Sequence, residues 1–334
     1  MIRAAVLVKK NKLKVYSNII LPKLDENQVL VKIVYSGICG SQLFEIKGLR
    51  GKDKFFPHLL GHEATGIVKD LGKNVKNVKR GDKVFLSWIK DNKKDAKKPQ
   101  YKKNNKIINA GNITTLSNMS IISSNRVFKL PKNINFKSGV LLGCALPTGA
   151  GIVINNRSKN NKILIIGLGG VGLSSLLASL YFKTKHIDIL EKNPLKINHI
   201  KKKIQKKNIN YFKKINYLKK NYYDLVIETS GTTKMITNSM DFVTIGGKLV
   251  FASHPKFNSK IKLNPFDLIL GKKIYGTWGG GINFKKDLNI LTKILSSFPM
   301  INNLFFNKTY QLNNINSAIK DFEKGVVIRP LIKF

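Results

Sequence analysis

The sequence predicts an α/β chain with two domains, one rich in β-strands and one built on a doubly wound parallel sheet. A chain of 334 residues is longer than one hydrophobic core usually supports, so two domains of ordinary size are expected. Up to about residue 145, short apolar runs are separated by Gly, Asp and Asn turns, which is typical of β-strands. Beyond this point, apolar runs alternate with helix-like segments, which is typical of a parallel α/β unit.

The first domain is expected to span residues 1–145. Residues 90–106 are mostly Lys, Asn and Asp without apolar periodicity, and this composition predicts an exposed loop. Residues 279–334 contain a charged helix-like stretch and a final apolar strand, and we expect this tail to return to the first domain. The clearest strands of this domain are predicted at 29–35, 64–68 and 83–88.

The second domain is expected to span residues 146–278. Its uncharged stretch 163–182 is long enough to cross a bilayer, but clustered glycines near its start favour a strand, a loop and a helix over a membrane span. The amino terminus has charge too early and an apolar run too short for a secretory signal, so a cytoplasmic protein without a membrane partner is expected. The predicted elements are strands at 162–166, 187–191, 225–228 and 248–252 and a helix at 170–181.

The net charge of +42 is extreme and raises the question of an anionic partner such as nucleic acid. Lys is spread through nearly every segment and is accompanied by abundant Asn and Ile, as expected when an AT-rich genome biases codon use. The chain also lacks a recognisable nucleic-acid motif. We therefore expect no specific nucleic-acid partner, and keep a basic nucleic-acid-binding protein as the alternative from another functional class.

A glycine-rich loop follows the apolar run 163–166. In such a loop the first glycine permits a tight turn, the second lets backbone approach a pyrophosphate, and the last lets the helix pack on the strand. The amino terminus of the following helix favours the phosphate charge. This arrangement predicts a Rossmann-type dinucleotide site with Gly167, Gly169, Gly170, Val171 and Gly172 as cofactor-binding residues.

Glu191 ends the next apolar run, nineteen residues beyond Gly172. A carboxylate at this place accepts hydrogen bonds from the adenosine ribose and repels a 2′-phosphate, which favours NAD over NADP. Lys192 and Lys196 weaken that preference, and Lys196 is itself a candidate cofactor-binding residue. The alternative for Glu191 is a solvated residue at a strand end.

The only two cysteines of the chain are Cys39 and Cys144, and His62 stands between them in sequence. Each has a structural interpretation when taken alone, as a small buried hydrophobe or a satisfied polar group. Two thiolates and one imidazole together form the ligand set of a catalytic zinc, in which the fourth position is left for water or substrate. We therefore predict a metal site formed by Cys39, His62 and Cys144.

These motifs, with the Gly-Asp-Lys-Val segment at 81–84, resemble the zinc-dependent alcohol dehydrogenases of the medium-chain dehydrogenase/reductase family. The likeness runs through nearly the whole chain. It implies a GroES-like catalytic domain and a Rossmann NAD-binding domain. It also implies one catalytic zinc, hydride transfer between an alcohol and NAD, and a homodimer or homotetramer formed through the nucleotide domain.

The same resemblance implies roles for four further residues. Glu63 would approach the metal during ligand exchange, and Ser41 would relay the proton of the alcohol. Thr148 would lie near the nicotinamide, with a packed hydroxyl as the alternative. Arg329 would reach from the tail to the cofactor pyrophosphate, with a surface cation as the alternative.

The sequence departs from the family at three places. Many relatives hold a second, structural zinc with four cysteines after the 81–84 segment, but both cysteines here are already assigned, so a single zinc is predicted and the 90–106 segment must be ordered differently. Gln42 stands where the family usually has an Asp that orients the histidine ligand; a neutral amide can still accept the ring N–H. Phe44 replaces a histidine that passes the proton to solvent, which leaves Glu45 as a weak candidate.

The substrate is the least determined feature. Trp88 falls where relatives place an aromatic pocket residue, although an ordinary core indole is the alternative. We expect an alcohol, with polyols, sugars and their phosphorylated derivatives as candidates. The nearest rival function is a zinc-free quinone or enoyl reductase on the same scaffold, and a scaffold protein would explain neither the ligand set nor the glycine loop.

Overall fold

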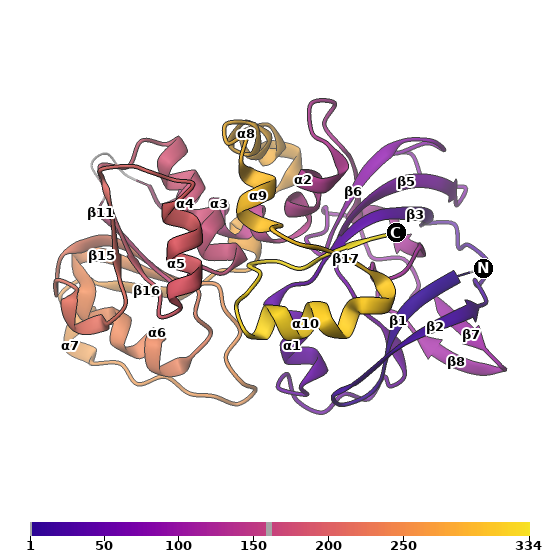
Figure 1. Ribbon diagram of the computed structural model, residues 1–334, viewed down its shortest axis with the longest axis horizontal. Coiled ribbons are helices and arrows are strands. Elements are labelled where there is room, and N and C mark those ends of the chain that lie inside the picture. The colour runs from indigo at the N-terminus through magenta and orange to yellow at the C-terminus, as the bar shows by residue number, and fades with distance from the viewer. Residues whose placement is uncertain (1, 158–161) are drawn as a thin grey trace. The chain divides into compact units, whose positions relative to one another are not determined.

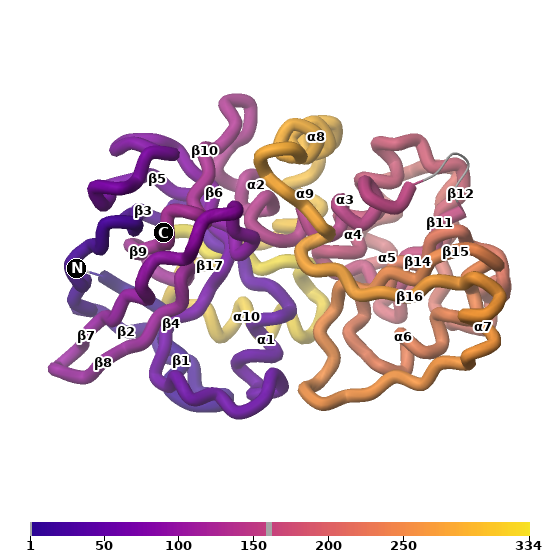
Figure 2. The backbone as a smooth tube through the Cα atoms, turned by 180° about the vertical axis from the view of Figure 1, so that it is seen from behind, coloured from indigo at the N-terminus to yellow at the C-terminus, as the bar shows by residue number. Residues whose placement is uncertain are grey.

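The computed structural model describes residues 2–157 and 162–334. Its contacts divide the chain into two units, Met1–Cys144 with Phe306–Phe334, and Ala145–Phe305 (Figures 1 and 2). The division after Cys144 lies one residue from the expected boundary. Residues 279–305 differ from the expectation, because they belong to the second unit and not to the first.

Close packing of glycines explains why this segment stays with the second unit. The turn η5 (Gly279–Gly281) lies on helix α3 (Ala145–Asn156), where the Asn155 amide donates to the Gly280 carbonyl at 2.8 Å. A Cβ atom at Gly151 would lie only 2.5 Å from the same oxygen. The next helix, α8 (Phe284–Ser296), buries one apolar face. Its sequence pattern predicts a helix but does not say which domain covers that face.

The larger sheet of the first unit has the strand order β10-β6-β5-β3-β18-β17, and β9 also pairs with β3. The strands predicted at 29–35, 64–68 and 83–88 fall in β3, β5 and β6. The central strand β3 has partners on both sides, and its apolar side chains are buried with those of β5 and β6. The strands are β3 (Gln28–Gly37), β5 (Glu63–Leu71), β6 (Lys83–Ser87), β9 (Met119–Ser123), β10 (Val127–Lys129), β17 (Thr309–Gln311) and β18 (Leu331–Lys333).

The smaller sheet has the order β2-β1-β4-β8-β7 and corrects one prediction. Residues 90–106 are not loop throughout, because β7 and the start of β8 form a hairpin there. Tyr101 anchors the hairpin: its ring is buried and its hydroxyl accepts the Ile121 N–H at 2.8 Å. One buried ring is too little to produce an apolar periodicity. The strands are β1 (Ile2–Lys9), β2 (Lys12–Ile19), β4 (His58–Leu59), β7 (Gln100–Lys103) and β8 (Lys106–Asn109).

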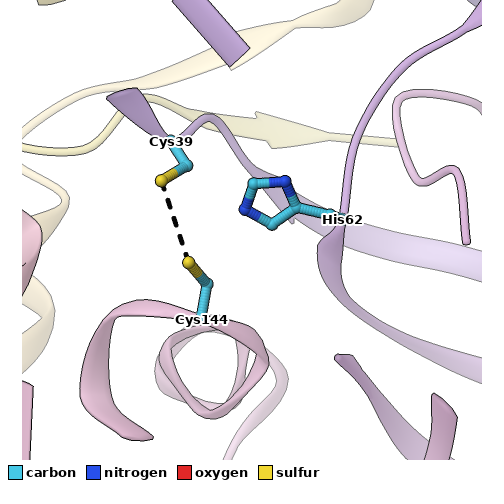
Figure 3. A group of neighbouring side chains, drawn as sticks. All are labelled: Cys39, His62 and Cys144. Atoms are coloured by element: carbon cyan, nitrogen blue, oxygen red, sulfur yellow. Dashed lines mark hydrogen bonds between the residues drawn. The ribbon is translucent and has the colours of Figure 1, made fainter. Parts of the chain in front are cut away.

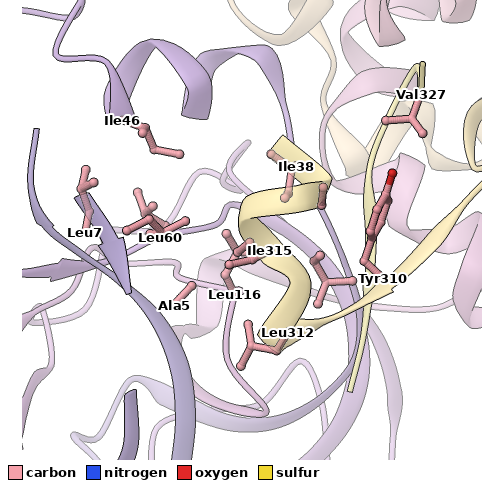
Figure 4. Close-up of a cluster of buried hydrophobic side chains, with 13 residues drawn as sticks. Ala5, Leu7, Ile38, Ile46, Leu60, Leu116, Tyr310, Leu312, Ile315 and Val327 are labelled. Carbon is pink, nitrogen blue, oxygen red and sulfur yellow. The ribbon is translucent and has the colours of Figure 1, made fainter. Parts of the chain in front are cut away.

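A shared core explains why the tail from Phe306 returns to the first unit. The strand β18 pairs antiparallel with β3, and helix α10 (Ile315–Glu323) places Ile315 and Ala318 among side chains from the amino terminus (Figure 4). Burial of such side chains supplies the main free energy of this arrangement, at about 25 cal/mol per Å² of apolar surface. The other helical segments of this unit are α1 (Gly40–Ile46), η1 (Ser124–Arg126), α2 (Phe136–Gly139), η2 (Val140–Gly143) and η6 (Leu312–Asn314).

The second unit contains a parallel sheet with the order β13-β12-β11-β14-β15-β16. The chain starts in the middle of this sheet at β11, runs to one edge and then continues on the other side, as in a doubly wound fold. The predicted fold class is thus confirmed. The strands are β11 (Lys162–Ile166), β12 (His186–Leu190), β13 (Ile209–Phe212), β14 (Tyr223–Glu228), β15 (Val243–Phe251) and β16 (Lys273–Gly276).

The helices of the second unit start where the sequence offers caps. The Asn193 side chain accepts the Leu195 N–H at 2.9 Å, and Pro194 follows as the first helical residue of α5. Helix α4 instead begins at the glycine loop. The helical segments are α4 (Gly170–Tyr181), α5 (Pro194–Lys201), η3 (Ile215–Tyr217), α6 (Thr233–Ser239), η4 (Met240–Phe242), α7 (Pro265–Ile269) and α9 (Ile301–Phe305), with α3, α8 and η5 given above.

The uncharged stretch 163–182 forms β11, the glycine loop and α4, as predicted. Among the described residues no single helix is long and apolar enough to cross a membrane. One bent pair, Phe136–Gly143 with Ala145–Asn156, has the length and composition but is broken between its two parts.

Candidate metal centre and nucleotide loop

The first unit brings the predicted metal ligands together. Cys39 follows β3 and precedes α1, His62 immediately precedes β5, and Cys144 follows η2. Their three ligand atoms all lie within 4.8 Å of one another, and the imidazole faces the two sulfur atoms (Figure 3). Residues far apart in sequence therefore form one compact donor set.

The donor set has the chemistry and spacing of a zinc site. The two Sγ atoms are 3.8 Å apart, and two thiolates at about 2.3 Å from a tetrahedral metal are separated by about 3.8 Å. The Nε2 atom of His62 is buried and has no hydrogen-bond partner among the described residues. A buried polar atom without a partner costs about 1–3 kcal/mol, so it indicates a ligand. The three residues fit a zinc ion with one coordination position left open.

A buried ion pair supports this site. Arg329 donates from Nε to Glu63 Oε1 at 2.7 Å and from Nη2 to Oε2 at 2.9 Å, and both side chains are at most 2% exposed. Arg329 is therefore not the surface cation that was its alternative. Side chains at Gly37 and Gly143 would overlap Glu63, which explains the glycines two residues before Cys39 and directly before Cys144. Glu63 and Arg329 thus form a paired charge next to the ligands.

The thiols are electrostatically unequal. The hydrogen bond donated by Cys144 lowers the pKa of Cys39 well below that of an ordinary thiol, and the Arg329 charge lowers it further. The same hydrogen bond and burial raise the pKa of Cys144. Burial raises the pKa of Glu63, although Arg329 acts in the opposite direction. Of the two thiols, Cys39 is therefore the one that loses its proton more readily, and the Arg329 charge favours its thiolate.

Gln42 does not do what the sequence suggested. Its Oε1 accepts the backbone N–H of Cys39 at 2.7 Å, so this oxygen holds the start of α1 and not the imidazole. Its Nε2 is buried without a hydrogen-bond partner among the described residues. The amide therefore supports the Cys39 ligand, because a side chain three residues into a helix can reach back to the N-cap.

Two further predicted residues of the first unit are near the ligand-bearing segments in sequence. Ser41 is half-buried in the first turn of α1, two residues from Cys39. Trp88 is half-buried and directly follows β6. The sequence analysis missed Ser87, whose hydroxyl donates to the Gly143 carbonyl at 2.9 Å and thereby fixes the segment before Cys144. A buried polar residue at the end of an apolar strand is the signal that could have indicated it.

The glycine loop of the second unit connects β11 to α4. Gly167 has a φ angle of +91°, a conformation that residues with a side chain rarely adopt. A Cβ atom at Gly172 would overlap the Gly167 carbonyl, whereas a Cβ atom at Gly169 would meet nothing within 4 Å. Gly170 and Val171 form the first turn of α4. Gly169 is thus the position where backbone is open to a ligand at the helix amino terminus.

Glu191 closes the loop from the side. Its Oε2 accepts the Leu168 N–H at 2.8 Å and its Oε1 accepts the Asn193 N–H at 2.9 Å. Lys196 Nζ lies 3.9 Å from the same carboxylate. Glu191 is buried and is not the solvated strand-end residue that was its alternative.

Two further residues of the second unit bear on a cofactor. Thr148 is buried in the first turn of α3, and its role at the nicotinamide stays a prediction. Glu228, which the sequence analysis did not single out, ends β14 opposite Ile166 in register and accepts the Ser253 hydroxyl at 2.8 Å. Burial raises the pKa of Glu228, while hydrogen bonds from Ser230 lower it. Its carboxyl fastens the segments after two neighbouring strands.

Comparisons with known proteins agree with this arrangement. Residues 25–132 match the family profile described as alcohol dehydrogenase GroES-like domain. A relative in sequence is S-(hydroxymethyl)glutathione dehydrogenase of Photobacterium damsela subsp. piscicida, 25% identical over 92% of this chain and 93% of that protein.

Solved structures share the whole fold. The chain is similar to the alcohol dehydrogenase zinc-binding domain protein from Burkholderia ambifaria, with a TM-score of 0.88, 20% identity, and coverage of 100% of this chain and 98% of that one. It is also similar to benzyl alcohol dehydrogenase from Acinetobacter calcoaceticus, with a TM-score of 0.84, 23% identity, and coverage of 100% and 99%. At these identities the likeness establishes the fold.

Proposed function

We propose that this chain, which belongs to the alcohol dehydrogenase-like family of medium-chain dehydrogenases/reductases, is a zinc-dependent, NAD-linked alcohol dehydrogenase. The observation that carries the proposal is the Cys39, His62 and Cys144 set, with its unpartnered imidazole nitrogen and its two closely spaced sulfurs. A zinc-free reductase on the same scaffold has no need of such a set. The chain's second unit supplies the glycine loop for the dinucleotide.

The residues divide the work of the reaction. Zinc, when bound, supplies a Lewis acid for the alcohol oxygen, and NAD supplies the hydride acceptor. Cys39, Cys144 and His62 would hold the metal. Ser41 would relay the proton of the alcohol, accepting it at the hydroxyl oxygen while passing its own hydroxyl proton on toward water. The Glu63 carboxylate, paired with Arg329, places a compensated charge beside the thiolates. We assign Arg329 to this pair first, and a role at the cofactor pyrophosphate would require the pair to loosen.

NAD is the proposed cofactor because Glu191 lies directly beside the glycine loop. Its carboxylate offers acceptors to ribose hydroxyls and disfavours a 2′-phosphate. Lys196, 3.9 Å from this carboxylate, tempers the preference. Glu191→Ala should therefore narrow the difference between the Kd values for NADH and NADPH, as measured by the fluorescence of the reduced cofactors. An unchanged ratio of the two Kd values would contradict the assignment.

The proposed substrate is an alcohol without a fixed identity, and sugars, polyols and their phosphates deserve testing because the surface is strongly basic. The test is reduced-nicotinamide absorbance with zinc-loaded protein, NAD or NADP, and a panel of these compounds. Turnover with NAD on one class supports the proposal. Protein that retains no zinc after gel filtration, yet reduces a quinone or an enoyl compound, would replace it with the zinc-free reductase.

We also propose that the chain forms a homodimer through the β16 edge of the parallel sheet. Among the described residues β16 pairs only with β15, so its other edge offers unpaired backbone groups. Apolar side chains nearby are exposed: Ile245 by 66%, Phe266 by 59% and Ile269 by 77%. Ile269→Lys should shift the sedimentation coefficient toward that of a monomer. A monomeric wild-type chain, or an unchanged oligomer in this variant, would contradict the interface.

A further inference from the structure

The segment between β6 and β7, residues 88–99, is held by side chains and not by regular structure. Its sequence contains five lysines and two aspartates, and in solution such a composition favours an open chain. Relatives with four cysteines can close this part of the fold around a metal, but this chain has no cysteine there. A different closure must therefore be present.

Asp95 and Arg126 provide it. Arg126 donates from Nε to Asp95 Oδ1 and from Nη2 to Asp95 Oδ2, both at 3.0 Å, which is the two-pronged geometry of strong guanidinium–carboxylate pairs. Asn125 Nδ2 donates to the same Oδ1 at 3.0 Å and to the Lys93 carbonyl at 3.0 Å. The Arg126 side chain is only 14% exposed. The pair is therefore shielded from water more than an ordinary surface ion pair.

The third arm of the guanidinium reaches Trp88. Arg126 Nη1 donates to the Trp88 carbonyl, so one side chain connects the first residue of the segment with Asp95, seven residues further on. Arg126 itself ends η1, directly before Val127, which pairs with Leu86 in the sheet. The Asp95–Arg126 ion pair, which we call the clamp, is thus attached to the larger sheet through β10.

Trp88 directly follows a residue that is tied to the neighbours of two metal ligands. Ser87 pairs in the sheet with Glu63, the residue after His62. The Ser87 hydroxyl also binds the carbonyl of Gly143, the residue before Cys144. A movement of the Trp88 backbone would therefore displace Ser87 and, through it, Glu63 and Gly143, which are next to the ligands His62 and Cys144.

We infer that Arg126, through its pair with Asp95, is a positioning residue that holds Trp88 as a wall of the substrate pocket beside Cys39, His62 and Cys144. The inference rests on the proposed function for the meaning of the pocket, but not for the clamp itself. It assigns to a protein ion pair the ordering that four cysteines and a metal supply in other members of the family.

The protonation of Asp95 determines the pH range over which the clamp is stabilising. Burial opposes ionisation, but hydrogen bonds from Arg126 and Asn125 and the nearby charges keep the pKa of Asp95 below its ordinary value. The stabilisation is therefore present above the ordinary aspartate pKa and is lost as the pH falls through the lowered value. The clamp is closed at neutral pH.

The test compares Arg126→Met with Arg80→Met. Arg80 also pairs with an aspartate, Asp70, but this pair is exposed and remote from Trp88 in the sheet. We expect Arg126→Met to lower kcat/KM for the alcohol by about 10–100-fold, as for loss of other groups that orient a metal site, with zinc content and the Kd for NAD unchanged. Arg80→Met should leave all three unchanged. Arg126→Lys, which keeps one charge but loses the fork, should recover part of kcat/KM.

Two readouts do not need activity. In a Trp278→Phe background the remaining indole is Trp88, and Arg126→Met should change its emission maximum. Trypsin should cleave faster at Lys93 and Lys94 in Arg126→Met than in Arg80→Met, because the segment opens. If the wild-type chain has no dehydrogenase activity, the proposed function fails and these readouts alone decide on the clamp. Equal emission, cleavage and kcat/KM in the two variants would overturn the inference.

Discussion

The two units of the chain prepare their ligand sites by opposite means. In the first unit the site is formed by side chains: two sulfurs 3.8 Å apart, an imidazole nitrogen that has no hydrogen-bond partner in the described part of the chain, and a bidentate ion pair next to them. In the second unit the site is formed by the backbone: a loop in which Gly167 has a positive φ and Gly172 has no room for a Cβ atom. The metal site requires particular donor atoms, whereas the glycine loop requires positions that have no Cβ atom.

This difference predicts how each site fails. Replacing a ligand in the first unit should remove the metal without disturbing the nucleotide, because the donors belong to one unit. Adding a methyl group in the second unit should affect nucleotide binding or folding without disturbing the metal. Variants of each kind therefore test whether the metal site and the nucleotide site can be lost independently.

The largest effect is expected for Cys39→Ser. Loss of a thiolate should remove the zinc and reduce kcat by more than about 10⁴-fold, or more than ~5 kcal/mol of activation free energy. The Kd for NAD should stay within about twofold of wild type, since no contact of the nucleotide loop is changed. Steady-state kinetics and cofactor titration measure the two quantities. Substantial remaining turnover would show that the sulfur is not a metal ligand.

Arg329→Met should produce the next largest effect, on stability. It leaves the buried Glu63 carboxylate unpaired, which costs about 3–5 kcal/mol in the free energy of unfolding. Urea unfolding measures this loss, and the double variant Glu63→Gln with Arg329→Met should recover part of it. If the double variant is no more stable to urea than Arg329→Met, Arg329 stabilises the fold through contacts other than this carboxylate.

The same variant has a predicted pH dependence. The pKa of Glu63 is raised by burial, and without Arg329 it should rise further. A carboxyl with a raised pKa binds its proton more tightly in the folded state, so its contribution to stability is fully present below the ordinary glutamate pKa and is lost as the pH rises through the raised value. The free energy of unfolding that Arg329→Met loses relative to wild type should therefore grow from acid to neutral pH. Urea unfolding of both proteins over this range tests the sign, and a difference that shrinks as the pH rises would contradict it.

The glycine loop offers a matched pair of smaller changes. Gly172→Ala should destabilise the second unit by about 1–3 kcal/mol, because the new methyl group overlaps the Gly167 carbonyl. Gly169→Ala should leave the unfolding free energy unchanged, because nothing lies within 4 Å of its methyl group, yet it should weaken NAD binding. Thermal unfolding and isothermal titration separate the two outcomes. Wild-type NAD affinity in Gly169→Ala would remove the loop from the cofactor site.

Lys196→Met should have the smallest effect. Its Nζ lies 3.9 Å from Glu191, at the limit of an ion pair, so the unfolding free energy should change by less than about 0.5 kcal/mol. The variant shows whether the second unit uses any side-chain charge for its ligand. A large rise in the Kd for NAD would mean that the second unit also binds the nucleotide through a side-chain charge.

Most of this arrangement was predictable, because both kinds of site leave marks in sequence. Cysteine is rare and chemically specific, so Cys39 and Cys144 could be assigned with His62 from residue type and order. Glycines at fixed offsets between an apolar strand and a helix could be assigned from spacing. The parallel, doubly wound sheet could be predicted from the alternation of strands and helices, although the order of its strands could not.

The parts that could not be predicted depend on partners brought from elsewhere in the chain. Arg329 pairs with Glu63 across 266 residues of sequence, and no local pattern announces such a pair. The Gln42 amide could have accepted either the Cys39 backbone N–H or the His62 ring N–H, and it accepts the former because Gln42 lies in the first turn of α1. Residues 279–305 carry an amphipathic helix whose pattern is the same whichever unit covers it. The 90–106 hairpin depends on one buried ring, Tyr101.

The most direct test of the central claim is the zinc content per chain after gel filtration, measured by plasma mass spectrometry for wild type and Cys39→Ser in parallel. The account predicts one zinc per wild-type chain, because the sequence offers a single thiolate set, and none in the variant. A wild-type chain that retains no zinc, or a variant that keeps it, would contradict the assignment of Cys39, His62 and Cys144 as the metal centre.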